Sequence, residues 1–495
     1  MLCKDCFKMI KKEKSYFISF LVISLLVFRF SEGFQGNKRE YIITLICIIT
    51  TLALIGIYLN GRMKMYKYVF CTIIILGGLS LLIQPILNIP DETTHFARAE
   101  IISEGEWKID PSEQYFDTIK SVVDLQENCA QTIINATTVK EKKIDYTLKK
   151  VDHVAAANMT ILYIPQAIGI GCAKIFNLNV IWMMWLARFM NLLMYAIMCS
   201  NAIRITPRLQ KLLFFLAVFP MSIQQAASCS VDATINGSAI LFVAFFLKLR
   251  YSDKIRIKEY VLLWGMGTFI AVAKVTNIFI AGLILLLPIK RKEEKTKELL
   301  CKICMVVSIV VIGALHYYYT TTFAPILQQT EYLTSMNVNS GAQIQYILNN
   351  FKDWLYYFVM TVFNQSWGYV EQLNVYGWLS YSCPFLSLIM VYMFGKLCAE
   401  EEGVNFSKIE RLLIVLMVLG IYGATCLALY IGWSPVGNKE VLGVQGRYFI
   451  PMLVLLGMVL TIPQNSKKNI NHDINVMMTI MLTNSMLINT AIRYY

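Results

Sequence analysis

The sequence lacks the short motifs by which many nucleotide-binding and hydrolytic enzymes are identified. It has no Walker A loop, no glycine fingerprint of a dinucleotide-binding domain and no nucleophile elbow. Charged residues are scarce as well: they make up 16% of the 495 residues, whereas hydrophobic residues make up 57%. The missing motifs leave ATP-driven transport and soluble-type hydrolysis without support. The composition excludes an ordinary soluble domain and predicts a polytopic membrane protein.

Cysteine also lacks an organised pattern. The 13 cysteines lie mostly within or beside apolar runs, and the long polar segment of the chain holds only Cys129. We therefore expect no disulfide framework. Two lone CxxC pairs, Cys3/Cys6 and Cys301/Cys304, have no partner pair and no nearby histidine, so we do not expect metal binding there.

Positive charge is plentiful, but its distribution does not suit nucleic-acid binding. The formal net charge is +13, and most Lys and Arg residues lie in short gaps between apolar runs. Loops on the cytoplasmic side of a membrane carry such an excess. We therefore expect a lipid bilayer as the surroundings and no nucleic acid as a partner. The basic N-terminus should lie in the cytoplasm and lead into an uncleaved first span.

The apolar runs predict an all-α integral membrane protein, a polytopic bundle with about 13 transmembrane helices. One further run, 159–176, is broken by Pro165 and by glycines. Counting it as a span would place the basic turn 204–211 outside, so we interpret it as re-entrant or interfacial. No internal repeat is evident, which disfavours inverted-repeat transporters. The predicted spans are 16–30, 41–59, 68–86, 180–203, 212–228, 233–249, 260–273, 275–289, 299–320, 380–398, 412–431, 448–462 and 476–492.

The alternation of spans and basic turns divides the chain into five regions. We expect two of them to lie on the outer face of a bacterial cytoplasmic membrane, because they are polar and follow outward-going spans. The regions are 1–87 (N-terminal transmembrane helices), 88–158 (a large outer loop with an acidic motif), 159–320 (transmembrane core), 321–380 (an extracytoplasmic or interfacial segment) and 381–495 (C-terminal transmembrane helices).

The predicted topology gathers ionisable residues from distant parts of the chain near the outer membrane boundary. Several come from Pro90-Asp-Glu-Thr-Thr-His-Phe-Ala-Arg-Ala99, which opens the outer loop. Ionisable residues at membrane depth are costly, so their coincidence predicts a functional site. The residues are Asp91, Glu92, His95, Arg98, Asp232, Lys274 and Arg447.

The acidic residues of this group allow two kinds of chemistry. A carboxylate partly removed from water has a raised pKa and can take a proton from an attacking hydroxyl, a role that suits Asp91 or Glu92. Alternatively, Asp91, Glu92 and His95 hold a divalent metal ion with Asp232. Asp232 also fits a simpler role as the N-cap of the following helix.

The basic residues suit a phosphate. Arg98, Lys274 and Arg447 are candidates, and the planar fork of arginine matches phosphate oxygens. The alternatives are structural. Lys274 can extend its ammonium to the interface, and Arg447 can anchor the start of a span.

Two of these stretches resemble the signatures of a bacterial membrane protein family, domain of unknown function 2142. They are Pro90–Ala99 and Val444-Gln-Gly-Arg-Tyr-Phe-Ile-Pro451, and weaker similarity occurs at 228–232, 273–277 and 377–384. The resemblance covers roughly residues 70–465. Thr93 stands where the family often has proline, and Ser380 stands where it often has an acidic residue.

That family in turn resembles the GT-C class of membrane glycosyltransferases, which use a polyprenyl-phosphate-linked sugar. The resemblance implies that Asp91, with Glu92, occupies the place of the catalytic acid pair, and that Arg447 lies near the donor phosphate. We therefore expect transfer of a sugar from a lipid-linked donor to a cell-envelope glycan acceptor outside the cytoplasm. The rival functions are a lipid-linked glycan transporter or flippase, a glycan polymerase or ligase, and a noncatalytic partner of an envelope enzyme.

Overall fold

The structure is a computed structural model that describes residues 18 and 22 and most of 36–495. It does not describe residues 109, 111–112, 114, 153, 290–293, 324–334, 375–383, 401–402 and 462–472. The predicted first span, the Cys3/Cys6 pair and most of the 377–384 stretch, including Ser380, therefore lie outside the described residues.

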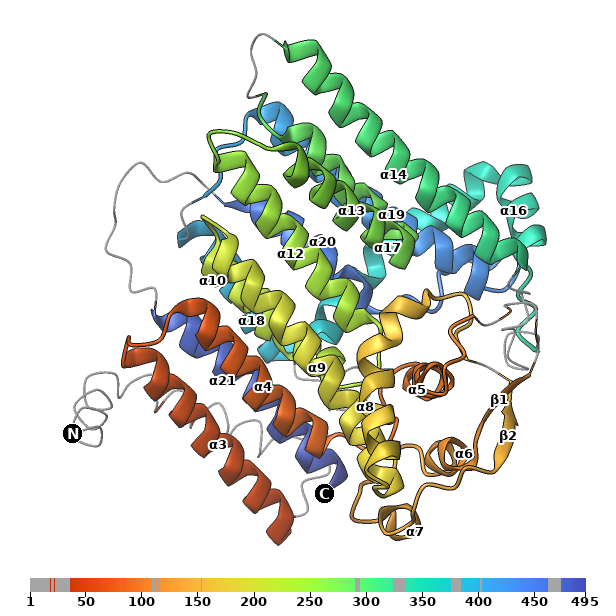
Figure 1. The fold of residues 1–495 in the computed structure, drawn as a ribbon. Coiled ribbons are helices and arrows are strands. Elements are labelled where there is room, and N and C mark those ends of the chain that lie inside the picture. The colour runs from red at the N-terminus through yellow and green to blue at the C-terminus, as the bar shows by residue number, and fades with distance from the viewer. Residues whose placement is uncertain are drawn as a thin grey trace.

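The described chain is mostly helical, and its long helices run side by side as one bundle (Figure 1). Most predicted spans have a helical counterpart with nearby bounds. The bundle helices are α3 (Lys38–Leu59), α4 (Met65–Ile83), α9 (Val180–Ile205), α10 (Gln210–Val218), α11 (Pro220–Ala226), α12 (Asp232–Tyr251), α13 (Ile257–Ala273), η2 (Val275–Leu286), α14 (Lys295–Phe323), α18 (Pro384–Glu400), α19 (Lys408–Trp433), α20 (Ile450–Leu460) and α21 (Asp473–Tyr494).

Within the described residues, six helices are long and apolar enough to cross a membrane: α3, α4, α9, α12, α14 and α19. The protein is therefore a polytopic helical membrane protein. The total of about 13 spans stays a prediction, because other predicted spans are shorter or broken. The 212–228 run, for example, divides into α10 and α11 before Pro220, which cannot donate a backbone hydrogen bond.

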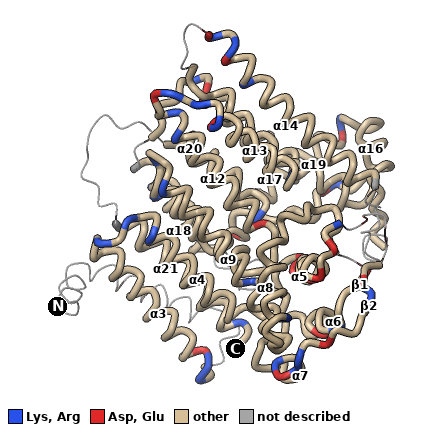
Figure 2. The backbone as a smooth tube through the Cα atoms, viewed as in Figure 1, with Lys and Arg blue, Asp and Glu red and all other residues tan. Residues whose placement is uncertain are grey.

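The basic turns meet at one end of the bundle. The Arg204 guanidinium carbon lies 5.5 Å from the Tyr66 ring centre, and that of Arg208 lies 4.9 Å from the Tyr251 ring centre. Arg208 also donates a hydrogen bond to the Gly403 carbonyl over 3.3 Å. Figure 2 shows Lys and Arg concentrated there, at the upper left. We call this the basic end, formed by the turns 60–64, 206–209, 252–256 and 403–407.

A smaller layer, residues 88–179, covers the opposite end of the bundle, and we call it the cap (Figure 1). Its buried apolar residues, among them Phe96, Val122 and Leu125, belong to a second hydrophobic cluster that extends to the adjoining end of α9. Its strands form an antiparallel pair in which Phe116 faces Val151. Its elements are α5 (Glu92–Ser103), β1 (Phe116–Ile119), α6 (Lys120–Glu127), α7 (Thr137–Lys140), β2 (Leu148–Val151), η1 (Thr160–Tyr163) and α8 (Ile164–Ile175).

Both ends of the η1–α8 segment stay at the cap. Arg98 of α5 donates to Thr160 over 3.1 Å, and Lys174 forms an ion pair with Glu100 of α5 at 2.6 Å. The 12-residue α8 packs closely on α9, because a Cβ added at Gly169 would lie 2.2 Å from a backbone oxygen of α9. The segment predicted to be re-entrant or interfacial is thus a short helix that folds back along α9.

Three further elements border the cap side of the bundle. The segment predicted to be extracytoplasmic or interfacial contains α16 (Ser340–Asn349) and α17 (Phe351–Asn374). The short 3₁₀ helix η5 (Gly446–Phe449) lies against α17 and leads into α20. Lys274 occupies the break between α13 and η2, so these two helices form a hairpin with Lys274 at its turn.

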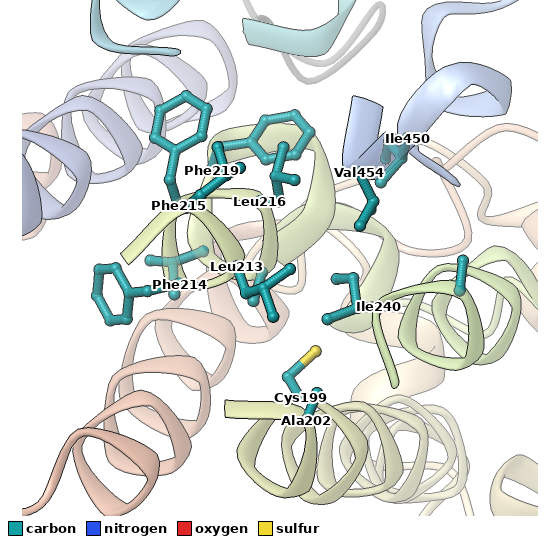
Figure 3. Packing of buried hydrophobic residues seen from close by; sticks show 14 of the residues in the cluster. Cys199, Ala202, Leu213, Phe214, Phe215, Leu216, Phe219, Ile240, Ile450 and Val454 are labelled. Atoms are coloured by element: carbon teal, nitrogen blue, oxygen red, sulfur yellow. The ribbon is translucent and has the colours of Figure 1, made fainter. Parts of the chain in front are cut away.

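The bundle interior is built from helices that are distant in sequence (Figure 3). Cys199 of α9, Leu213 of α10, Ile240 of α12 and Val454 of α20 are at most 1% exposed. In a bilayer, close packing of such side chains holds helices together, because lipid is as apolar as the protein interior. This packing holds α9, α12 and α20 in fixed relative positions, and these helices carry or adjoin the charged residues of the site.

Candidate functional site

Asp91, the first residue of the site, has a backbone conformation that residues other than glycine rarely adopt. Its φ of 63° lies in the left-handed region, where Asp is tolerated better than most residues. It is the N-cap of α5, yet its side chain makes no capping hydrogen bond. An N-cap aspartate normally accepts from the first turn of its helix. Here the carboxylate instead pairs with Arg447, and 54% of the Asp91 side chain remains exposed.

Arg447 joins the cap to the bundle. It donates to the Pro90 carbonyl over 3.1 Å and to the Asp91 carboxylate, and its Nη1 lies 3.3 Å from a carboxylate oxygen of Asp232. Its side chain is only 2% exposed. The preceding Gly446 permits this placement, because a Cβ there would lie 2.3 Å from the Tyr369 carbonyl oxygen. Arg447 therefore bridges two carboxylates from distant parts of the chain.

Lys274 and Tyr448 complete the charged group. The Lys274 Nζ lies 3.8 Å from Asp232 and 3.7 Å from the centre of the Tyr448 ring, a cation–π geometry. Arg447 also donates to the Tyr448 hydroxyl over 3.3 Å. Asp232 is the first residue of α12 and receives both cations, so it does more than begin a helix. Two cations and two carboxylates thus share one location.

Glu92 points away from this group. Its carboxylate accepts two hydrogen bonds of 2.8 Å from Arg188 and one of 3.0 Å from the Cys229 backbone. The side chains of Glu92 and Arg188 are both 0% exposed. Arg188 also donates to the Pro85 carbonyl over 2.8 Å. Such a buried, bidentate pair fixes α5 against α9, and it leaves Glu92 without access to a substrate.

His95 lies behind Asp91 in a hydrogen-bonded group of neutral side chains. Its Nδ1 is 2.8 Å from the Tyr163 hydroxyl, to which Asn158 donates over 2.9 Å. Burial lowers the pKa of His95 to about 4, although the carboxylate of Asp91 opposes that shift. His95 is therefore a neutral hydrogen-bonding residue near pH 7, where it is not poised as a proton carrier.

Arg98 does not join the other basic residues. Its side chain donates to the Thr160 hydroxyl, while its Nε and Nη1 are buried with no hydrogen-bond partner among the residues that the structure describes. Burial lowers its pKa from the usual value. Arg98 does not line the cavity described next, so its predicted role in phosphate binding gains no geometric support.

A cavity of about 280 Å³ opens beside the charged group. Its floor includes Thr276 of η2 and Thr425 of α19, whose hydroxyls are buried and have no hydrogen-bond partner among the described residues. An unpaired buried hydroxyl costs free energy unless a ligand or water satisfies it. The lining residues are Asp91, His95, Asn158, Val231, Asp232, Ile235, Ala273, Lys274, Thr276, Thr425, Ala428, Leu429, Arg447 and Tyr448.

The predicted metal ligands do not form a ligand set in this arrangement. Within the described ranges, no three His, Cys, Asp or Glu side chains are grouped so that they could hold a metal ion. Arg188 forms an ion pair with Glu92, and Arg447 forms ion pairs with both Asp91 and Asp232.

Five of the seven predicted site residues line one cavity, namely Asp91, His95, Asp232, Lys274 and Arg447.

A comparison with protein families gives one match. The model of a family described as predicted membrane proteins, DUF2142, matches residues 74–456. The chain belongs to that family. The match includes both halves of the site, the stretch around Asp91 and the stretch around Arg447. No curated protein and no solved structure matched the chain.

Sequence reasoning missed several residues of the site. Arg188 is a lone charge inside the apolar run that forms α9, and that signal was available. Tyr448 follows Arg447 directly and resembles any other aromatic at a span end. No sequence pattern distinguishes Thr276 and Thr425. They matter because their hydroxyls are buried without a partner among the described residues, and only the folded structure shows this.

Proposed function

We propose that this protein is a GT-C-like glycosyltransferase. It would move a sugar from a polyprenyl-phosphate donor to a hydroxyl of a cell-envelope glycan. One observation carries the proposal: a half-exposed carboxylate, Asp91, shares a cavity with the cationic side chains of Arg447 and Lys274. Glycosyl transfer from a phosphate donor needs a base for the acceptor and cations for the leaving phosphate.

The reaction would proceed by direct displacement. The acceptor oxygen forms a bond to the anomeric carbon while the bond from that carbon to the phosphate oxygen breaks. Asp91 takes the acceptor proton, and the electron pair leaves with the polyprenyl phosphate, which gains a negative charge. Attack from the opposite face inverts the anomeric configuration. Only Asp91 is assigned as the base, because Glu92 is buried against Arg188.

The pairing of Asp91 with Arg447 links proton transfer to phosphate departure. When Asp91 takes a proton, its attraction for the guanidinium falls. Arg447 can then direct more of its positive charge to the phosphate, whose own charge is growing. Lys274 supplies a second cation from the other side of Asp232. Stabilisation of this kind often supplies the largest part of a rate enhancement.

The floor of the cavity favours a ligand rich in hydroxyls. Thr276 and Thr425 line the cavity, and their hydroxyls lack a partner among the described residues, so a sugar hydroxyl that reaches them would supply one. A sugar offers many such partners, whereas an apolar ligand would leave both hydroxyls unsatisfied. The apolar lining from Ile235 and Leu429 suits the less polar face of the sugar or the first part of the lipid.

The distribution of charge supports an outer location for the reaction. Lys and Arg gather at the basic end, which the positive-inside rule assigns to the cytoplasm. The cavity is lined by Asp91, His95 and Asn158 of the cap. The cap lies at the other end of the bundle (Figure 1). We therefore assign the reaction to the extracytoplasmic face of a bacterial plasma membrane.

A lipid-linked glycan transporter is the second candidate, because a cationic cavity can bind a phosphate without any chemistry. Such a protein needs Arg447 and Lys274 but no base. The half-exposed Asp91 beside these cations favours transfer, because transfer needs a base for the acceptor hydroxyl. A polymerase or ligase would share the chemistry and differ only in its acceptor.

Glycan analysis of a deletion strain tests the proposal. The sugar composition and linkages of its envelope glycans are compared after complementation with the wild type or with Asp91→Asn at matched protein level. We expect one substituent to be lost on deletion, restored by the wild type and still missing with Asp91→Asn. Full restoration by Asp91→Asn would exclude Asp91 as the base and favour transport.

A further inference from the structure

Two adjoining cavities lie along α13 and α14, at the other end of α13 from Lys274. One has a volume of about 370 Å³ and the other about 690 Å³. Both are lined by Ile257, Tyr260 and Cys301, so they adjoin, and we call the two together the α13–α14 groove. Because α13 has 17 residues, the groove mouth lies about 25 Å from Lys274.

The inner part of the groove is apolar. It is lined by Val261, Trp264, Cys304 and Met305 together with the residues shared by both cavities. The Trp264 indole nitrogen donates to the Ser308 hydroxyl over 2.9 Å, so the polar atoms of this pair are already satisfied. The spanning part of α14 is largely uncovered by protein, with 17% of its residues buried. This part of the groove therefore faces the hydrocarbon of the bilayer.

The mouth of the groove is charged, and its carboxylates have cations of their own. Glu298 pairs with the buried Lys302 at 3.0 Å and accepts from Tyr260 over 2.9 Å. Glu294 lies 3.6 Å from Lys297.

Two further cations border the mouth. Lys254 and Arg256 are exposed, and neither has a carboxylate within ion-pair distance in the described part of the chain. Their charge is available to an anion at the depth where lipid headgroups lie.

We propose that the α13–α14 groove binds one anionic phospholipid. Its headgroup phosphate contacts Lys254 and Arg256, and one acyl chain follows the apolar part past Trp264. The charge of the mouth and the apolar interior match the two halves of such a lipid, and the combined volume suits a drug-sized or larger ligand. This site is separate from the Asp91 cavity and does not depend on the proposed transferase activity.

Native mass spectrometry of the full-length protein in neutral detergent tests this inference. The probes are dioleoyl phosphatidylglycerol, dioleoyl phosphatidylcholine and soluble glycerol phosphate. We expect retention of one phosphatidylglycerol at concentrations where phosphatidylcholine is lost, and no competition by glycerol phosphate. The double variant Lys254→Gln/Arg256→Gln should bind phosphatidylglycerol about 30-fold more weakly. The control Lys64→Gln/Lys67→Gln, at the same end of the bundle, should bind it as the wild type does.

A bulky side chain in the groove tests whether the acyl chain binds there or whether only the headgroup binds at the surface. Cys304→Trp, with Val261→Trp as a second variant if the first does not fold, should also abolish retention of phosphatidylglycerol, because the acyl chain loses its place. Unchanged binding by the folded Trp variant would overturn the proposal. So would equal retention of the two phospholipids, or equal weakening in the Lys64/Lys67 control.

Discussion

Arg447 and Asp91 are 356 positions apart in the chain, and their side chains form an ion pair at the cavity. The pair is asymmetric: the Arg447 side chain is 2% exposed, whereas that of Asp91 is 54% exposed. The cation is thus held in the protein while the carboxylate reaches the cavity. This difference assigns the two residues different tasks, a fixed phosphate contact for Arg447 and proton transfer for Asp91.

Replacing Arg447 with lysine should slow transfer although the charge is kept. Lysine cannot reproduce the planar fork that reaches Pro90, Asp91 and Asp232 together. Losing one or two charged hydrogen bonds, each about 1.5–3 kcal/mol, predicts a rate decrease of roughly 10- to 100-fold or more. Transfer in membranes measures this, with the exposed Arg62→Lys as the control. Wild-type rates for Arg447→Lys would contradict the assigned role.

Glu92 and Asp91 should respond differently to the same change. Glu92→Gln leaves the buried Arg188 without a counter-charge, which costs about 3–5 kcal/mol of stability. Asp91→Asn breaks a half-exposed pair and should cost about 1 kcal/mol or less. Melting temperatures in detergent measure the difference.

The double variant Glu92→Leu/Arg188→Leu should recover part of the loss, because it leaves no charge buried. A Glu92→Gln protein as stable as the wild type would show that the buried pair contributes little to stability.

His95 should make the protein less stable as the pH falls below 6.5. Its pKa is about 4 in the fold, whereas an unfolded histidine has a pKa near 6.5. Between these values the unfolded chain binds more protons, so the stabilisation is complete above pH 6.5 and is lost as the pH falls toward 4. The loss should reach about 2 kcal/mol at pH 5.

The fall in melting temperature between pH 7 and pH 5 measures this effect. His95→Gln does not titrate and keeps a hydrogen-bonding group near Tyr163, so its fall should be smaller than that of the wild type. Equal falls in the two proteins would mean that His95 is not the titrating group.

Replacing either of the two cavity threonines should lower the transfer rate without lowering the stability of the protein. Thr276→Val and Thr425→Val remove hydroxyls that have no partner in the described part of the chain, so stability should stay the same or rise. Transfer should slow by about 2- to 10-fold per hydroxyl, from 0.5–1.5 kcal/mol of lost hydrogen bonding.

Thr483→Val is the matched control, because the Thr483 hydroxyl donates to the Val218 carbonyl over 2.7 Å. That variant should lower the melting temperature. If Thr276→Val and Thr425→Val instead lower the melting temperature and leave transfer unchanged, the two hydroxyls do not contact the sugar.

Charge and hydropathy predicted much of the fold because they report where each apolar run begins and ends. The bounds of α3, α9 and α12 fall within a few residues of the predicted spans, and the predicted basic turns meet at one end. The type of helix was harder to predict. The run after Lys274 is a 12-residue 3₁₀ helix, a geometry that hydropathy cannot distinguish from an α-helix.

The site was predicted as a set of residues, but not as a set of roles. Asp91 and Glu92 are neighbours in sequence, yet the left-handed backbone at Asp91 and the start of α5 turn their side chains to different partners. Arg98 stands one turn after His95 and still misses the cavity. These differences depend on backbone angles and on partners such as Arg188, which lie about 100 residues away.

Direct transfer by purified protein tests the central claim most directly. Wild-type protein and Asp91→Asn in proteoliposomes are supplied with the total lipid-linked sugars and the envelope glycan of the deletion strain. Products are followed by mass spectrometry and by nuclear magnetic resonance of the new linkage. We expect the wild type to consume one polyprenyl-phosphate sugar and to form one glycosidic bond with inverted configuration, and Asp91→Asn to form none. The account would be contradicted if folded wild-type protein left every lipid-linked sugar chemically unchanged. It would also be contradicted if Asp91→Asn formed as much product as the wild type.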